Sequence, residues 1–163
     1  FMCGGDKDSF EKAKPILQGM GKNIVHCGSG GLGQATKICN NMLAGINALA
    51  AAEAMTMGER LGVSPDILYE VISTSTGRSY IFETSNPMPD VCSTSPANDK
   101  FKPGFMAKLM LKDLRLSQAA AQDAKTSTPL GAAATAAFQQ LIDSGFGDLD
   151  TSSIIKVIKP ESK

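Results

Sequence analysis

The sequence predicts a mainly α-helical domain that follows a short β-α-β segment. Residues 34–61 contain no proline and are rich in alanine, methionine, leucine and glutamate, which are strong helix formers. Residues 1–27 instead hold two short apolar runs on either side of one amphipathic segment. The chain has 163 residues, 42% of them hydrophobic, which is enough for one folded domain with a core.

Two short strands and one helix are expected within the first 27 residues. Residues 1–5 and 23–27 have the character of strands, and Asp8 or Ser9 can cap the helix between them. One face of that helix would carry Phe10, Ala13, Ile16 and Leu17. Two such strands make too little sheet to be stable alone. We therefore expect the chain, which opens with the letters FMCGG, to be part of a longer protein.

The rest of the chain predicts about six helices. The first, over 34–61, would be about 40 Å long if unbroken. Ser64-Pro65 starts the next helix, and a turn or two can follow over 78–84. Residues 86–104 hold four of the eight prolines, so we expect an irregular surface stretch there.

Three more helices complete the expected bundle. One runs over 105–124, one begins at Thr128-Pro129, and a short last one begins at Asp150. The core face of the 105–124 helix would consist of Met106, Leu109, Met110, Leu114 and Leu116. The last helix would bury Ile154, Ile155 and Ile158.

Charge and composition argue against several partners. The 16 basic and 16 acidic side chains cancel, so the chain lacks the positive field that nucleic acids and anionic membranes attract. It has no tryptophan on which nucleic-acid bases could stack. No apolar run approaches the roughly 20 residues of a membrane helix. We expect neither a nucleic-acid nor a membrane partner.

The cysteines and the single histidine predict no metal site. Cys3, Cys27, Cys39 and Cys92 form no CxxC pair, and we interpret them as reduced thiols of an intracellular compartment. His26 has only Cys27 beside it, so a strand-end histidine is the simpler interpretation.

Residues 28–33, GSGGLG, match the G-x-G-x-x-G pattern of dinucleotide-binding loops. We reject that interpretation because Glu53, 20 residues beyond Gly33, falls in a helical run and not at the end of a strand. Gln34 also stands where a phosphate-binding loop would need lysine. The loop can still hold an anion at the start of the helix, or it can simply turn the chain.

Lys37, Asn40 and Asn41 share one face of the long predicted helix. The positive end of a helix repels a lysine near its start, and partial burial there would add to the lowering of its pKa. Such a lysine suits proton transfer, with asparagines as neutral hydrogen-bond donors. The alternative is a solvated helix face.

A third group comprises Phe105, Lys112 and Asp113. Phe105 and Lys112 are seven residues apart and would share a helical face, where a phenyl ring and an ammonium group could flank a flat cofactor ring. A core phenylalanine and a surface lysine would give the same spacing.

At these places together, the chain resembles the β-hydroxyacid dehydrogenase family. The stretch GSGGLGQATKICNNML is similar to the family's G-x-x-G-x-G-x-x-x-K-x-x-x-N motif, in register at Gly28, Gly31, Gly33, Lys37 and Asn41. Segments 52–55, 86–89, 95–98 and 105–114 resemble the mitochondrial branch that acts on 3-hydroxyisobutyrate. Asp90 departs from the pattern, since relatives often have glycine after N-P-x-P.

The resemblance implies a domain organisation. The fold would be an all-helical bundle like the C-terminal domain of 6-phosphogluconate dehydrogenase, preceded by a remnant of a Rossmann domain. Residues 1–28 would be the tail of that dinucleotide-binding domain. Residues 29–163 would form the substrate-binding and oligomerisation domain, which begins with a long interdomain helix. The cofactor would be NAD, bound mainly by the preceding domain.

The resemblance also implies roles for individual residues. Lys37 would be the catalytic acid/base, and the substrate would be bound by Gly33, Asn40 and Asn41. Lys112 would contact the cofactor, with Phe105 lining the cleft and Asp113 orienting Lys112. No metal ion is implied.

The implied activity is the NAD-dependent oxidation of 3-hydroxyisobutyrate to methylmalonate semialdehyde in valine breakdown, in the mitochondrial matrix, by a homodimer or homotetramer. These 163 residues alone would be inactive. Two alternatives stay open, a glyoxylate or succinic semialdehyde reductase of the same family and a non-catalytic helical dimerisation domain.

Overall fold

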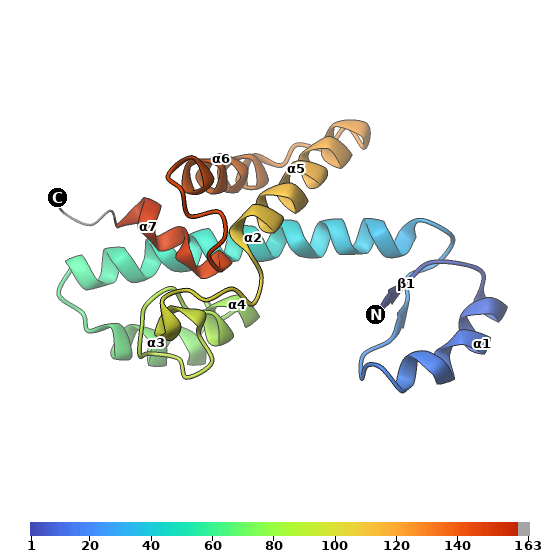
Figure 1. The fold of residues 1–163 in the computed structure, drawn as a ribbon, viewed down its shortest axis with the longest axis horizontal. Helices are drawn as coiled ribbons and strands as arrows, with labels where there is room; N and C mark the ends of the chain where they lie inside the picture. The colour runs from blue at the N-terminus through green and yellow to red at the C-terminus, as the bar shows by residue number, and fades with distance from the viewer. Residues whose placement is uncertain (160–163) are drawn as a thin grey trace. The chain divides into compact units, whose positions relative to one another are not determined.

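The computed structural model describes residues 1–159 and shows a mainly helical chain (Figure 1). It divides into two compact units, Phe1–Asn41 and Met42–Lys163. The division falls inside the longest helix, α2 (Leu32–Arg60), so this helix contributes to both units. The last four residues of the predicted 29–163 domain lie outside the described residues.

The first unit contains the predicted β-α-β segment. Strands β1 (Met2–Cys3) and β2 (Val25–His26) pair in parallel, with α1 (Lys7–Gln18) between them. His26 lies in β2 as expected, with its ring stacked on Phe10 at 4.8 Å between centroids and its Nε2 2.8 Å from the Gly5 carbonyl oxygen. The simple structural interpretation of this histidine is confirmed.

Two details of α1 differ from the sequence-based prediction. The cap is Asp6, not Asp8 or Ser9, because its carboxylate accepts a 2.9 Å hydrogen bond from the Ser9 N–H. That hydrogen bond lowers the pKa of Asp6. The predicted apolar residues all lie in α1, but only Phe10 is buried, while Ile16 is 71% exposed. A two-stranded sheet offers too little surface to cover a whole helix face.

The second unit holds the helical core. After α2 come α3 (Pro65–Thr74), α4 (Tyr80–Thr84), α5 (Ala107–Asp123), α6 (Pro129–Asp143) and α7 (Ile155–Ile158), with short 3-10 turns η1 (Pro96–Asp99) and η2 (Thr151–Ile154). Helices α5 and α6 pack against each other, and α7 contacts α6 (Figure 1). The fully buried side chains at the centre include Met55, Leu114, Phe138, Leu141 and Ile154.

The buried face of α5 is rotated from the predicted one. Ala107, Met110, Leu111 and Leu114 are buried, as is the polar Ser117, whereas Leu109 and Leu116 are 39% and 50% exposed. Spacings of three and four residues relate the buried positions, as one helix face requires. The apolar pattern misleads because an alanine and a serine occupy core positions while two leucines do not.

The proline-rich stretch 86–104 is irregular apart from η1 and about half of its residues are exposed, as predicted, but part of it is buried, which the prediction did not include. Asn86, Pro87, Met88, Ser95 and Ala97 are buried. The Asn86 carbonyl accepts a hydrogen bond from Ser95 Oγ, and the Asn86 side-chain oxygen accepts from the Met88 N–H at 3.1 Å. Side-chain amides and hydroxyls thus form hydrogen bonds with backbone groups that are not in a helix, and these particular residues can be buried.

Asp150 caps the start of the last short helical segment, η2, as predicted. Its buried carboxylate accepts hydrogen bonds from the Ser152 N–H at 2.9 Å and from the backbone N–H groups of Gly104 and Phe105 at 3.0 and 2.9 Å. This one side chain therefore fixes both η2 and the approach to α5. Ile154 and Ile155 are buried as expected, and Ile158 is half-buried.

Across residues 1–159, no helix combines the length and apolar character needed to cross a bilayer. The same residues contain no cluster of three side chains suited to hold a metal ion. The four cysteines are free thiols, with Cys92 buried.

Candidate functional site

The glycine loop forms a tight turn between β2 and α2. Gly28 and Gly31 have φ values of +108° and +89°, which side-chain-bearing residues rarely adopt. Gly33 is buried, and a Cβ built on it would lie 2.5 Å from the Met2 carbonyl oxygen and 2.9 Å from the Gly4 nitrogen. Close backbone packing therefore explains Gly33 without a ligand, and substrate binding at Gly33 stays a prediction.

The structure agrees with the rejection of a dinucleotide fingerprint in this loop. Glu53 lies in α2 and is exposed, so it does not end a strand. The two strands found among residues 1–159 both precede the loop. A dinucleotide fingerprint requires a second strand after the helix, to carry the acidic residue to the ribose.

Lys37, Asn40 and Asn41 lie in the second and third turns of α2, within the first unit. The Asn40 amide nitrogen donates a 3.1 Å hydrogen bond to the side-chain oxygen of Asn41, so the two asparagines form a pair. Lys37 is exposed, and the expected partial burial is not seen. An exposed ammonium beside two amides can meet a small polar ligand, and the catalytic role of Lys37 stays a prediction.

Lys112 and Asp113 form an ion pair on α5, in the second unit. Lys112 Nζ lies 2.8 Å from Asp113 Oδ1, and the carboxylate side chain is only 8% exposed whereas that of the lysine is 56% exposed. The buried Asp113 carboxylate thus fixes the position of the accessible Lys112 ammonium, as expected if Asp113 orients Lys112. Their role at a cofactor stays a prediction.

Phe105 lies before α5 and not on it. The helix begins at Ala107, so Phe105 and Lys112 do not share a helical face as the spacing suggested. The ring is 36% exposed, and its backbone N–H is bound by Asp150. Phe105 is therefore held rigidly with its ring partly accessible, which is compatible with a cleft-lining residue.

Asp90, which departs from the family pattern, has φ of +65°. Glycine adopts this left-handed conformation without strain, and aspartate is among the residues that tolerate it best. The Asp90 N–H donates a 2.8 Å hydrogen bond to the side-chain oxygen of Asn98. This hydrogen bond stabilises the turn. Asp90 therefore has the left-handed backbone conformation that a glycine at this position would also adopt.

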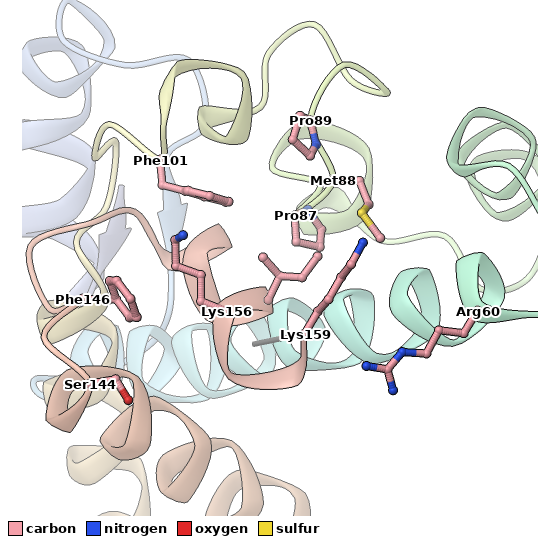
Figure 2. A pocket seen from close by; sticks show the side chains of 10 residues that line it. Arg60, Pro87, Met88, Pro89, Phe101, Ser144, Phe146, Lys156 and Lys159 are labelled. Atoms are coloured by element: carbon pink, nitrogen blue, oxygen red, sulfur yellow. The ribbon is translucent and has the colours of Figure 1, made fainter. Parts of the chain in front are cut away.

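A cavity of about 680 Å³ in the second unit was not anticipated from the sequence (Figure 2). Its walls come from the end of α2, the segment after Asn86, the end of α6 and α7. Arg60, Lys156 and Lys159 supply positive charge, and proline, methionine and phenylalanine side chains supply apolar surface. The only sequence signal is the spacing of Lys156 and Lys159, which would share a face if both were helical, but α7 ends at Ile158.

Two known family models match the chain. Residues 31–158 match the model described as NAD-binding of NADP-dependent 3-hydroxyisobutyrate dehydrogenase. Residues 1–28 match the NAD-binding domain of 6-phosphogluconate dehydrogenase. The first match covers most of the chain, including the whole helical bundle.

Individual relatives agree with these matches. An NAD-dependent L-serine dehydrogenase from Pseudomonas aeruginosa is 41% identical over 98% of this chain and 54% of its own length. The mitochondrial 3-hydroxyisobutyrate dehydrogenase of Drosophila melanogaster is 40% identical over 99% of this chain and 50% of its own length. The chain thus spans about half the length of the curated relatives it matches.

Solved structures show the same fold. The 3-hydroxyisobutyrate dehydrogenase of Mycobacterium tuberculosis, in a structure with L-serine, superposes with a TM-score of 0.92 at 40% identity, covering 98% of this chain and 54% of that one. The enzyme of that name from Salmonella typhimurium gives 0.83 at 30% identity, covering 96% and 53%. The predicted mainly helical fold with its short β-α-β start is confirmed. By its sequence and its fold, the chain belongs to the 3-hydroxyisobutyrate dehydrogenase family.

Proposed function

We propose that the chain is the substrate-side half of an NAD-dependent dehydrogenase of small 3-hydroxy acids, with 3-hydroxyisobutyrate as the first candidate substrate. The observation that carries the proposal is Lys37 with Asn41 one helical turn later at the start of α2, in a chain of this family. A lysine with two neutral amide groups beside it suits proton transfer to and from a hydroxy acid, which a non-catalytic helical domain does not perform.

L-serine is the second candidate substrate. One relative is named an L-serine dehydrogenase, and the Mycobacterium tuberculosis structure contains L-serine. L-serine and 3-hydroxyisobutyrate share a carboxylate and a hydroxyl group on the third carbon, so the same proton acceptor serves both. None of the relatives named above is a reductase of glyoxylate or succinic semialdehyde, the other expected alternative.

The residues of this chain fit an NAD site from the substrate side. Phe105 offers a partly accessible flat ring and Lys112 an accessible ammonium held by a buried carboxylate, both suited to a polar aromatic ligand. When bound, NAD supplies the acceptor for the hydride that leaves the hydroxyl-bearing carbon. Lys37 takes the hydroxyl proton at Nζ, and the asparagine amides bind the substrate oxygens, so that oxidation yields an aldehyde.

The proposal includes a domain organisation. Residues 1–28 would be the tail of a dinucleotide-binding domain, and 29–163 the substrate-binding and oligomerisation domain. The match of the first 28 residues to a dinucleotide-binding model and the small sheet of β1 and β2 support this. NAD would be held mainly by that preceding domain. A homodimer or homotetramer acting in valine breakdown in the mitochondrial matrix completes the proposal, and of these parts the location is supported by the mitochondrial relatives.

The test is a substrate profile of the full-length protein that contains this chain. NAD reduction is measured with 3-hydroxyisobutyrate and L-serine, and NADH oxidation with glyoxylate and succinic semialdehyde. We expect kcat/KM for one of the hydroxy acids to exceed that for either aldehyde by about tenfold, or about 1.4 kcal/mol of transition-state binding. Preference for the aldehydes would support the reductase alternative, and no turnover with any of the four would support the non-catalytic one.

A further inference from the structure

Asp150 is a buried carboxylate that the proposed reaction does not use. The residue lies at the start of η2 and is only 3% exposed. It binds the segment just before α5, and it is 45 residues away in sequence from Phe105. Carboxylates are rarely buried unless hydrogen bonds or charges satisfy their oxygens. The hydrogen bonds of Asp150 therefore indicate which part of the structure this side chain serves.

The two carboxylate oxygens of Asp150 bind different segments. Oδ1 accepts hydrogen bonds from the N–H and from the hydroxyl of Ser152, both at 2.9 Å, and so caps η2. Oδ2 accepts from the N–H groups of Gly104 and Phe105, at 3.0 and 2.9 Å. The second pair of hydrogen bonds has no part in the cap. It holds the residues that lead into α5.

The Phe105 backbone is also bound through its carbonyl group. This oxygen accepts hydrogen bonds from the Thr151 N–H at 2.9 Å and from the Thr151 hydroxyl at 3.2 Å. The consecutive residues Asp150 and Thr151 thus bind both polar groups of the Phe105 backbone. A fixed backbone fixes the direction of the Cα–Cβ bond, and the Phe105 residue that it carries is 36% exposed. The direction of this accessible ring therefore depends on a distant part of the chain.

The same segment also sets the start of α5. The first N–H groups of a helix have no partner within it, and α5 has no side-chain cap. The Ala107 N–H instead donates to the Leu149 carbonyl at 2.8 Å, and the Lys108 N–H donates to the Gly147 carbonyl at 3.0 Å. Residues 147–151 therefore replace the missing cap, and the helix that carries the proposed cofactor lysine begins from them.

We propose that Asp150 is a positioning residue for the cofactor, because its carboxylate directs the Phe105 ring toward bound NAD. This inference rests on the proposed function, in which Phe105 lines the cofactor cleft. Asp150 itself touches no reacting atom, since its oxygens are bound to backbone N–H groups and to Ser152. A change at Asp150 and a loss of the ring should therefore weaken NAD binding through one and the same contact.

Asp150→Asn separates the two roles of this carboxylate. Asparagine has nearly the same shape but only one side-chain oxygen, so it can accept hydrogen bonds from only one of the two segments. Asparagine caps helices as well as aspartate does, so its oxygen can keep Ser152 bound. Its NH₂ group then faces the N–H groups of Gly104 and Phe105, and donors do not bind donors. The variant should therefore release Phe105 while η2 stays formed.

The test is a double-mutant cycle in the full-length protein. The dissociation constant of NADH is measured, from the fluorescence of the bound cofactor, for the wild type, Asp150→Asn, Phe105→Ala and the double variant. We expect Phe105→Ala to raise this constant about tenfold and Asp150→Asn about fivefold, as one aromatic contact is lost or weakened. The double variant should match Phe105→Ala within about twofold, because no ring is left to position. Independent effects would instead multiply to about fiftyfold.

Two further readouts separate positioning from a purely structural role. In Asp150→Asn the KM for NAD should rise, while kcat with the preferred hydroxy acid stays within about twofold, since a contact that binds the ground and transition states equally changes KM alone. Amide hydrogen exchange should become faster at Gly104 and Phe105 and stay slow at Ser152, which locates the released segment.

Two other variants complete the design. Asp148→Asn makes the same chemical change two residues earlier, on a side chain that is 81% exposed and paired with Lys108, so it should bind NADH as the wild type does. If Asp150→Asn fails to fold, Thr151→Val carries the test, because it removes only the hydroxyl that binds the Phe105 carbonyl. It should weaken NADH binding about twofold, and not at all when Phe105 is already alanine.

Several results would overturn the proposal. One is a double variant that loses NADH affinity about fiftyfold, and another is a folded Asp150→Asn protein with the NADH affinity of the wild type. A third is Phe105→Ala with unchanged NADH binding, since the ring would then not contact the cofactor. Hydroxy-acid turnover by the wild type is measured in parallel and tests the proposed function separately. Turnover that persists alongside any of the three results contradicts this inference alone, whereas a wild type without turnover and without NADH binding contradicts both.

Discussion

The two units of the chain differ in how they are stabilised. In residues 42–159, side chains from α2, α4, α5, α6 and α7 form a common core in which Met55, Leu114 and Phe138 are fully buried. In residues 1–41, the one buried hydrophobic side chain is Phe10, and the sheet consists of two strands of two residues each. The second unit thus has a core, whereas the first is held mainly by backbone pairing and by close glycine contacts.

The hydrophobic core and the proposed catalytic lysine therefore lie in different units of the chain. Lys37 and the two asparagines lie in the sparsely packed unit, at the start of a helix whose other end is anchored in the core of the second unit. A catalytic side chain on such a segment can be exchanged with little effect on stability. A core side chain cannot, because its removal leaves a cavity.

The largest expected effect is in the core. Phe138→Ala removes a fully buried ring between packed helices, so it should lower the free energy of unfolding by about 3–5 kcal/mol. Phe10→Ala should have a smaller effect, since this ring packs mainly on His26. Urea unfolding gives the totals, and amide hydrogen exchange shows where protection is lost. Equal loss of protection in α5 and α6 for both variants would contradict the division into two units.

A smaller effect is expected where β1 meets α2. Gly33→Ala would place a methyl group 2.5 Å from the Met2 carbonyl oxygen, and backbone atoms cannot move aside as a flexible side chain can. We expect a loss of about 1–3 kcal/mol confined to the first unit. Gly30→Ala is the matched control, because a Cβ there has nothing within 4 Å. Exchange rates of the β1 and β2 amides distinguish the two variants, and similar rates would argue against the glycine contact.

The smallest expected effect concerns the cap of α1. The pKa of Asp6 is lowered below its usual 3.8 by the hydrogen bond from the Ser9 N–H. A lowered pKa in the folded state means that the cap stabilises fully above about 3.8 and loses its effect as the pH falls through the lowered value. Asp6→Ala should therefore weaken α1 at neutral pH and make no difference in strong acid. The amide chemical shift of Ser9, followed against pH in both proteins, tests this.

The sequence was informative wherever a local rule dominated. The long helix follows from an uninterrupted run of helix formers, and the Asp150 cap from a short acidic side chain ahead of an apolar segment. The ion pair between Lys112 and Asp113 agrees with the role that the family resemblance implies for Asp113. These features depend on residues close together in the chain.

The errors arose where distant contacts decide the structure. The burial of Asn86 and Ser95 within the proline-rich stretch depends on hydrogen bonds such as that from Ser95 Oγ to the Asn86 carbonyl, which composition does not reveal. The exposure of Leu109 and the burial of Ser117 depend on which face of α5 meets α6. The cavity in the second unit was missed for the same reason, because lining residues such as Arg60 and Phe101 are 41 positions apart in sequence.

The central claim is that Lys37 transfers the substrate proton, and Lys37→Met in the full-length protein tests it most directly. We expect kcat with the preferred hydroxy acid to fall by about 10²–10⁴-fold, the usual range for general acid–base catalysis. The free energy of unfolding should stay within about 0.5 kcal/mol, because the side chain is exposed. Lys12→Met should match the wild type in both measurements. A Lys37→Met enzyme that retains a kcat within about threefold of the wild type, less than a 1 kcal/mol change in barrier, would contradict the account.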